Sequence, residues 1–403
     1  MPEIYNEKDE IDEINIDKLK KKGICLSNRD TTEEIDYKNN RSIFKINFTG
    51  FEIDNKGKVV YFFPYQYKVH SLKHDAVTLF KTIYMHIQQR PELYFGEKKD
   101  SFLKSNFPFE SFFEIFEYYK ENGLYVEYYD QVLNRHTSKV NWKFTISNSE
   151  KYIIDDSIYF QTLYYRNTFE RENFITDCMS FIIEYTLSTF SFIFGVNSLG
   201  LKYKDWKFLE NREFVIRKLT LLNTRIFNSK GKKLLNAIIR FFKENKFGGN
   251  YYLKHYNFDS IWEDLVQHYL NNKFNGISKG MIDLEGSFTG NRFKKIPYHP
   301  NLNNENHSIQ PDNILIENGK TYIFDAKYFL PTGIDYKQVC YSIFLARNIS
   351  DLKNIYSALI VPGEERKKSE HFIMDPALNN DLSDLKISME FLDIRKVMEF
   401  YIN

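Results

Sequence analysis

The sequence predicts a mixed α/β fold of the α+β type, with a mixed sheet in a C-terminal α/β core, a helical middle region and a mixed α/β N-terminal region. Three observations lead to this prediction. After Gly249, the apolar pattern changes in the order helix, strands, helix, strand. The pair Asn318-Gly319 between two apolar runs is a strong β-hairpin signal. Between about residues 160 and 247, apolar residues recur mostly at helical spacing.

The N-terminal region is predicted to combine a loop-like start with a hairpin, two helices and a short strand. Residues 1–40 are rich in charged side chains and are expected to form loops. Residues 42–66 alternate aromatic and aliphatic side chains around an Asp-Asn-Lys-Gly sequence, which predicts a hairpin. The other predicted elements are helices at 75–89 and 108–122, the second ending at Gly123, and a short strand at 140–146.

The rest of the chain predicts a helical segment followed by an α/β domain. Helices are expected at 174–194, 208–222 and 232–246. They are followed by a helix at 258–271, the Asn318-Gly319 hairpin, a helix at 335–347, and strands at 355–361 and 387–394. These elements predict domains at 1–160, 161–247 and 248–403.

The composition is that of an ordinary globular protein. Three cysteines lie far apart without C-x-x-C spacing and indicate neither a disulfide framework nor a zinc site. The first residues are polar and acidic, and the longest apolar stretch, 181–195, contains Glu184 and is too short to span a bilayer. We therefore expect a cytoplasmic protein with no signal peptide and no membrane partner.

The net charge of +1 hides a basic segment. Residues 201–300 contain 19 Lys and Arg against 9 Asp and Glu. Such an excess can supply the phosphate contacts behind sequence-independent nucleic-acid affinity, or it can be a solvated helix face. Its position favours the first interpretation, because it directly precedes an acidic hairpin to which a nucleic-acid backbone would have to be drawn.

The hairpin segment 311–328, PDNILIENGKTYIFDAKY, brings charged side chains together. A two-residue turn at Asn318-Gly319 pairs residue 317 with 320 and, counting outward, Asp312 with Asp325. Directly opposed residues have Cβ atoms roughly 4.5–5.5 Å apart, and Lys327 emerges on the same face. Both faces also carry apolar residues, so the two strands are expected in the interior of a sheet.

Two carboxylates at this distance are stable when one is protonated or when a cation lies between them. Mg²⁺ prefers oxygen ligands and is typically bound by one or two carboxylates with water and substrate phosphate. We therefore predict a Mg²⁺ site, in which Mn²⁺ can substitute, with Asp312 and Asp325 as ligands and the peptide oxygen of Ala326 as an additional ligand. The alternative is a surface hairpin with an incidental aspartate pair and a solvated lysine.

The arrangement Pro-Asp, twelve residues, Asp-Ala-Lys resembles the motif of the PD-(D/E)XK nucleases, with Asp in place of the commoner Glu at the second acid. The resemblance implies that Asp312 and Asp325 hold Mg²⁺. It also implies that Lys327 is the catalytic lysine, which helps to orient or activate the attacking water and stabilises charge on the phosphate. The predicted order of helices and strands after Gly249 matches the α/β core of these nucleases.

Two more site residues are implied by the same resemblance. Several members of the superfamily place a metal-binding acid on the helix before the first core strand. In this sequence Glu263 is the candidate for that ligand, and Asp264 is the competing choice. A glutamine on the helix after the motif recurs in related nucleases. Gln338 is the candidate for that residue in this sequence. The alternatives are an ordinary exposed glutamate at 263 and a packing role for Gln338. His299 and His307, in the loop before the hairpin, are weaker candidates for a general base.

Four segments together resemble the LlaJI-type restriction endonuclease family: YYKENGLYVEYY at 118–129, NWKFTI at 141–146, FDSIWEDLV at 258–266, and the QPDNIL and YIFDAKY pair. This resemblance implies the nuclease component of a restriction system arranged like McrBC, acting on double-stranded DNA with a separate AAA+ GTPase subunit similar to McrB. The sequence contains no G-x-x-x-x-G-K-[ST] motif, so nucleotide hydrolysis is expected from that partner.

The predicted function is a Mg²⁺-dependent DNA endonuclease of a restriction or related phage-defence system, with target or partner recognition by residues 1–160, a connecting role for 161–247 and catalysis by 248–403. Two alternatives stay open: a non-catalytic DNA-binding or scaffold subunit of a defence complex, and a nuclease of repair or of RNA. The sequence leaves the oligomeric state open, a homodimer included.

Overall fold

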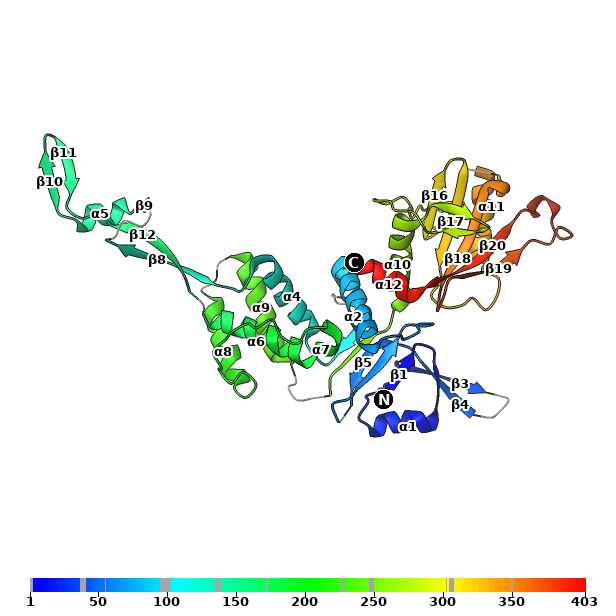
Figure 1. Cartoon of the computed structure of the whole chain (residues 1–403), viewed down its shortest axis with the longest axis horizontal. Coiled ribbons are helices and arrows are strands. Elements are labelled where there is room, and N and C mark those ends of the chain that lie inside the picture. Colours follow the sequence, from blue (N-terminus) through cyan, green and yellow to red (C-terminus); the bar gives the residue numbers. More distant parts are fainter. Residues whose placement is uncertain are drawn as a thin grey trace. The chain divides into compact units, whose positions relative to one another are not determined.

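The computed structural model describes residues 3–36, 41–54, 56–94, 102–134, 139–171, 173–224, 226, 228–245, 250–301, 303, 308–348 and 351–403. The chain forms two compact units (Figure 1). The first consists of Met1–Asn106, Phe192–Gly195 and Gly248–Asn403, and the second of Phe107–Ser191 and Val196–Phe247. Helices and mixed sheets occur in the structure, which confirms the predicted α+β class.

A five-stranded sheet organises the N-terminal part of the first unit. Its strand order is β1 (Glu3–Asn6), β6 (Val59–Phe63), β5 (Thr49–Ile53), β13 (Tyr252–His255) and β7 (Leu103–Ser105). The antiparallel pair β5 and β6 confirms the predicted hairpin. Gly50 permits the pairing of β5 with β13, because a Cβ at this position, where φ is +137°, would lie 2.0 Å from the carbonyl oxygen of Leu253.

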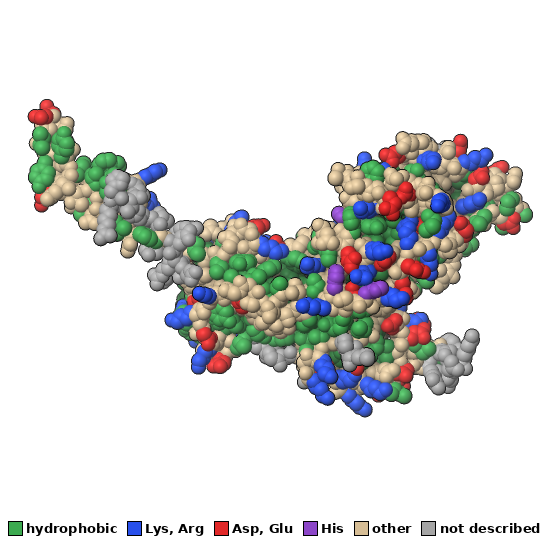
Figure 2. All heavy atoms as spheres, in the orientation of Figure 1, with side chains coloured by type: hydrophobic (Ala, Val, Ile, Leu, Met, Phe, Trp, Pro, Cys, Tyr) green, Lys and Arg blue, Asp and Glu red, His purple; other side chains and the backbone are tan. Residues whose placement is uncertain are grey.

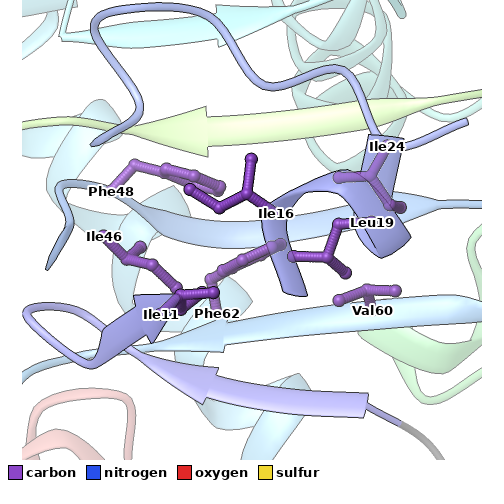
Figure 3. Close-up of a cluster of buried hydrophobic side chains, with 8 residues drawn as sticks. All are labelled: Ile11, Ile16, Leu19, Ile24, Ile46, Phe48, Val60 and Phe62. Atoms are coloured by element: carbon purple, nitrogen blue, oxygen red, sulfur yellow. The ribbon is translucent and has the colours of Figure 1, made fainter. Parts of the chain in front are cut away.

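Residues 1–40 are not mainly loops, so this prediction was wrong. They contain β1, β2 (Glu10–Asp12), α1 (Glu13–Lys21) and β3 (Thr31–Asp36), and β4 (Arg41–Ile46) completes a sheet with the order β2-β4-β3. Figure 3 shows the reason, a cluster of apolar side chains between α1 and the neighbouring strands. Its members are Ile11, Ile16, Leu19, Ile24, Ile46, Phe48, Val60 and Phe62. Tertiary packing stabilises a short helix whose own sequence is strongly polar.

The C-terminal part of the first unit is built on a second five-stranded sheet. Its strand order is β16 (Asn313–Glu317), β17 (Lys320–Ala326), β18 (Ile355–Gly363), β20 (Lys386–Asp393) and β19 (Lys367–Ile373). Strands β17, β18 and β20 are parallel, whereas β16 and β19 pair antiparallel with their neighbours. The predicted order of helix, hairpin, helix and strands is confirmed, and the structure adds β19, which the sequence analysis did not predict.

Helices accompany both parts of the first unit. They are α2 (Leu72–Gln89), α3 (Pro91–Tyr94), α10 (Phe258–Lys273), α11 (Tyr336–Asn348) and α12 (Ile394–Tyr401), with short 3₁₀ helices at Leu352–Asn354 and Asn380–Leu382 and a small hairpin of β14 (Gly276–Ser278) and β15 (Met281–Asp283). Tyr341 and Leu345 of α11 pack on Ile314 and Ile323 of the hairpin. This contact places α11 on the face of the sheet that also carries the two aspartates.

The second unit is largely helical. Its helices are α4 (Phe109–Asn122), α5 (Trp142–Asn148), α6 (Phe174–Thr189), α8 (Arg212–Asn223) and α9 (Ser229–Glu244), and α7 spans Ser191–Phe194 at the boundary of the two units. Strands β8 (Glu127–Leu133), β12 (Tyr165–Arg171) and β9 (Lys139–Val140) form one sheet, and β10 (Lys151–Ile154) and β11 (Ser157–Phe160) form a hairpin.

The predicted strand at 140–146 is instead the helix α5. Asn141 caps this helix, because its side-chain oxygen accepts a hydrogen bond from the backbone N–H of Phe144 at 3.2 Å. None of the helices in the described part of the chain combines the length and apolar character that crossing a membrane requires.

Candidate active site

The hairpin register agrees with the prediction. Asn318 and Gly319 have φ values of 53° and 72°, as a type I′ turn requires at both central positions. The observed pairs run from Glu317 opposite Lys320 to Asn313 opposite Phe324. The next position outward in this register is Asp312 opposite Asp325, so the local turn chemistry aligns the two acids.

One strand of the hairpin, β17, is an interior strand of the sheet, and the other, β16, is an edge strand. This corrects the expectation that both strands are interior. Strand β17 lies between β16 and β18, whereas β16 is the first strand of the sheet. On the outer side of β16, Lys294 and Ile314 form an antiparallel bridge, in which they exchange two backbone hydrogen bonds of 2.9 and 3.0 Å. The backbone at Lys294 therefore runs beside β16, two positions from Asp312.

The two aspartates are close enough to perturb each other. The Asp325 side chain is 6% exposed, and Asp312 accepts a hydrogen bond from the backbone N–H of Ala326 at 3.1 Å. Burial, followed by the negative charges of Asp325 and Glu263, raises the pKa of Asp312 to about 7. Near neutral pH, Asp312 is therefore partly protonated, and a cation bound at this group would favour its ionised form.

Lys327 is held between two carboxylates. Its Nζ atom lies 2.6 Å from Oδ2 of Asp325 and 3.3 Å from Oδ2 of Asp335. Burial alone would lower the pKa of Lys327, but the attraction of Asp325 and Asp335 outweighs it and raises that pKa. The lysine therefore remains charged at neutral pH and shares the predicted face with the acids.

Asp335 is a site residue that the sequence analysis missed. Besides contacting Lys327, it begins helix α11, where its Oδ1 atom accepts a hydrogen bond from the backbone N–H of Gln338 at 2.9 Å. An acid at a predicted helix start is a recognisable N-cap signal. That signal identifies the cap, but it does not reveal that the other carboxylate oxygen faces the motif lysine.

The structure separates the two adjacent acids of α10. The charge of Glu263 acts on Asp312, and Glu263 accepts a hydrogen bond from Nζ of Lys295 at 3.1 Å. Asp264 instead lies 3.2 Å from both Arg90 and the ring of His86. Glu263 is therefore the acid of this pair that lies near the hairpin. Trp262, beside it, is fully buried, as expected for a core residue.

Gln338 lies in the packed interior, in keeping with the packing role that the sequence left open for it. Its side chain is fully buried, and its amide nitrogen donates to the carbonyl oxygen of Ile323 at 2.9 Å and to Oγ of Ser357 at 2.8 Å. These bonds tie α11 to β17 and β18. Of the two loop histidines, His299 is exposed, and His307 lies outside the described residues.

The acid group suits a hard cation that needs few protein ligands. In the part of the chain that the structure describes, no set of three or more His, Cys, Asp or Glu side chains is arranged to hold a metal ion. Asp312 and Asp325 provide two carboxylates, which is a sufficient protein contribution for Mg²⁺ with water and phosphate. Burial first, and then the negative charges of Asp325 and Glu263, raise the pKa of Asp312, and a cation among these acids would offset the charge contribution.

Basic side chains accompany these acids. Figure 2 shows acidic and basic side chains next to one another on the visible surface of the first unit. From the basic segment 201–300, Lys295 reaches the acid group and lies 3.8 Å from Oδ1 of Asp312. Arg292 of the same segment forms an ion pair of 2.7 Å with Glu317 at the other end of β16.

Comparisons with known proteins give a family match and similar solved structures. The family model for the LlaJI restriction endonuclease matches residues 48–403. No curated protein matches the chain. A chain from the half-complex of the tetradecameric assembly of Thermococcus gammatolerans McrB AAA+ hexamers with bound McrC is 10% identical, with a TM-score of 0.38 over 100% of this chain and 99% of that chain. A chain of the McrBC complex of the same organism is 12% identical, with a TM-score of 0.24 over 67% and 88%. Scores this low support no inference about fold or assembly.

Proposed function

The chain belongs to the LlaJI restriction endonuclease family, and on this premise we propose that it is a Mg²⁺-dependent DNA endonuclease of a restriction or related defence system. The observation that carries the proposal is the hairpin register, which aligns Asp312 with Asp325 and leaves Lys327 2.6 Å from Asp325. The complete set of two acids and a lysine favours an enzyme of the PD-(D/E)XK type over a non-catalytic scaffold subunit.

Asp312, Asp325 and the peptide oxygen of Ala326 would hold the metal ion, with Glu263 as a further acid on the side of Lys295. When bound, Mg²⁺ lowers the pKa of a coordinated water and stabilises negative charge on a phosphate. Lys327 contributes as a charged hydrogen-bond donor to the phosphate oxygens, because Asp325 and Asp335 keep it protonated. A protonated lysine cannot accept the proton of the attacking water, so its contribution is electrostatic.

We further propose double-stranded DNA as the substrate and an McrB-like AAA+ GTPase as a partner. The sequence has no P-loop of its own, so GTP hydrolysis would come from that partner. Residues 1–160 would recognise target DNA or the partner, residues 161–247 would connect, and residues 248–403 would cleave.

The test is plasmid cleavage by purified protein, with and without Mg²⁺ and with and without the partner. Asp325→Asn and Lys327→Gln should each reduce the cleavage rate by at least about a hundredfold, because each removes a group that would act on the charged phosphate. Asp384→Asn, a change of the same chemistry at an exposed position of the same unit, is the control. Wild-type cleavage rates in either active-site variant would contradict the proposal.

The same assay distinguishes the alternatives. DNA binding that survives in Asp325→Asn while cleavage is lost would show that the substitution acts on catalysis. RNA and single-stranded DNA, used as additional substrates, separate a repair or RNA nuclease from a restriction enzyme. A wild-type protein that binds DNA but cleaves none of the substrates under any of these conditions would favour the scaffold alternative.

A further inference from the structure

A second lysine is fixed beside the acid pair. Lys295 follows Lys294, whose backbone forms the bridge to Ile314 at the edge of β16. The preceding residue, Phe293, is 1% exposed, and its backbone N–H donates to Oδ1 of Asn271 at 2.7 Å. The backbone is thus held by hydrogen bonds at the two residues immediately before Lys295, which distinguishes Lys295 from a lysine on a free loop.

The Lys295 side chain bridges two of the acids. Its Nζ atom donates to Oε2 of Glu263 at 3.1 Å and lies 3.8 Å from Oδ1 of Asp312. The side chain is 33% exposed, so it is neither locked in the core nor fully solvated. The structure therefore has a lysine on each side of the aspartate pair, Lys327 toward Asp335 and Lys295 toward Glu263.

The two lysines differ in what a metal ion would do to them. Lys327 retains Asp335 as a partner that no predicted metal ligand set includes. Both contacts of Lys295, in contrast, are with predicted metal ligands. A divalent cation among the acids would repel the ammonium group and compete for the same carboxylate oxygens. The four-carbon stem of lysine can then turn its charge toward another anion.

We propose that Lys295 is a second phosphate-binding lysine of the site: without metal it bridges Glu263 and Asp312, and with metal bound it turns to a phosphate of the DNA beside the cleaved bond. The inference rests on the proposed nuclease function. In the metal-free protein Lys295 serves as an internal counterion, and in the complex with DNA it becomes a backbone contact.

Lys295→Gln tests the inference, with Lys294→Gln as the matched control, because this exposed neighbour loses the same charge one residue away. Mn²⁺ binding is measured by calorimetry on the full chain at pH 8 without DNA. Lys295→Gln should tighten Mn²⁺ binding about tenfold, since a competing positive charge a few ångströms away is removed. Lys294→Gln should leave the Mn²⁺ affinity within about twofold of wild type.

Binding of duplex DNA in the presence of Ca²⁺ gives the second readout. Lys295→Gln should weaken binding and reduce the slope of log K against log salt by about one, the signature of one lost phosphate contact. An ion pair without a phosphate contact would also change the metal affinity, because it places the same charge beside the acids, but it would leave this slope unchanged. A wild-type salt slope for Lys295→Gln would overturn the inference, whatever the metal affinity.

Different results would contradict the nuclease assignment and the proposed role of Lys295. If Lys295→Gln behaves as wild type while Asp325→Asn cannot cleave, the role of Lys295 is wrong and the nuclease assignment stands. If Asp325→Asn and Lys327→Gln cleave at the wild-type rate, the nuclease assignment fails whatever Lys295 does.

Discussion

Glu7→Gln tests how the N-terminal segment is joined to the strand that carries the motif lysine. Glu7 is 5% exposed and follows β1. Its Oε2 atom accepts a hydrogen bond of 2.8 Å from the hydroxyl of Tyr328, the residue directly after Lys327. The same hydroxyl accepts a hydrogen bond of 2.7 Å from the backbone N–H of Tyr65. The carboxyl of Glu7 thus belongs to a buried chain of hydrogen bonds next to the site.

The size of the effect follows from the pKa of this carboxyl. Burial raises the pKa of Glu7 from 4.5 to about 7, although the hydrogen bond from Tyr328 and the charge of Lys8 act in the opposite direction. Because the pKa is higher in the folded state, folding favours the protonated form. The stabilisation is complete below about pH 4.5 and is lost as the pH rises through about 7. The full loss is about 3 kcal/mol, of which about 2 to 3 kcal/mol falls between pH 5 and pH 8.

Glutamine has nearly the same shape and can accept the hydrogen bond from Tyr328, but it does not ionise. The free energy of unfolding of Glu7→Gln should therefore exceed that of wild type at pH 8, and the difference between the two proteins should grow by about 2 to 3 kcal/mol from pH 5 to pH 8. Taking the difference removes the contribution of other acids, such as Asp312, that are present in both proteins.

Urea unfolding at the two pH values, with hydrogen exchange of peptides from β1 and β6, measures this difference for the first unit alone. Glu10→Gln, at a side chain that is 61% exposed, is the control and should show no growth of the difference. If the difference in unfolding free energy between Glu7→Gln and wild type is the same at pH 5 and pH 8, ionisation of the Glu7 carboxyl does not destabilise the folded protein, and the reasoning is refuted.

Three further outcomes are expected. The apparent Mg²⁺ affinity, measured by calorimetry, should weaken about tenfold from pH 8 to pH 6, because a proton on Asp312, whose pKa is about 7, competes with the metal; a constant affinity would contradict this. Gln338→Leu should lower stability by about 1 to 3 kcal/mol in urea unfolding yet leave the cleavage rate within about threefold, and a folded but inactive variant would instead place Gln338 in the catalytic set. Lys254→Met should lower stability by about 3 to 5 kcal/mol, because Asp30 and Glu52 would remain buried without their cation, and an unchanged melting temperature would argue against this.

Local sequence signals predicted the register of the hairpin that carries the candidate site residues. The turn at Asn318-Gly319 requires positive φ at both positions, and this requirement alone determines the register of the two strands. Alternation along a strand then places Asp312, Asp325 and Lys327 on one face. Each step depends on residues close in sequence, so no knowledge of the tertiary structure was needed.

Contacts between distant segments were beyond the same reasoning. Strand β13 enters the N-terminal sheet between β5 and β7, about 200 residues after β5 in the sequence, and its pairing depends on the missing side chain of Gly50. Helix α1 forms in a charged segment because its few apolar residues reach a core supplied by other strands. Neither contact has a periodic pattern that a single window of sequence would reveal.

The candidate site residues also differ in whether local sequence signals or contacts between distant segments reveal their roles. Lys295 and Asp335 are common charged residues in segments without a distinctive motif, and they become significant only because the fold brings them to the acids. Gln338 shows the reverse. Its position on α11 is the one that the superfamily resemblance implies, but its amide hydrogen-bonds to the neighbouring strands.

The placement of Asp335 bears on how the site would work. If Lys327 contacted Asp325 alone, a metal ion on that aspartate would remove the attraction that opposes the effect of burial on the lysine. Burial would then favour the neutral amine, which can act as a base. Asp335 stands outside the predicted ligand set and remains 3.3 Å from Nζ of Lys327, so it would keep the ammonium form whether or not the aspartates hold a cation. On the proposed function, Lys327 would therefore present a positive charge to the phosphate, and the proton of the attacking water would leave to an acceptor other than this lysine.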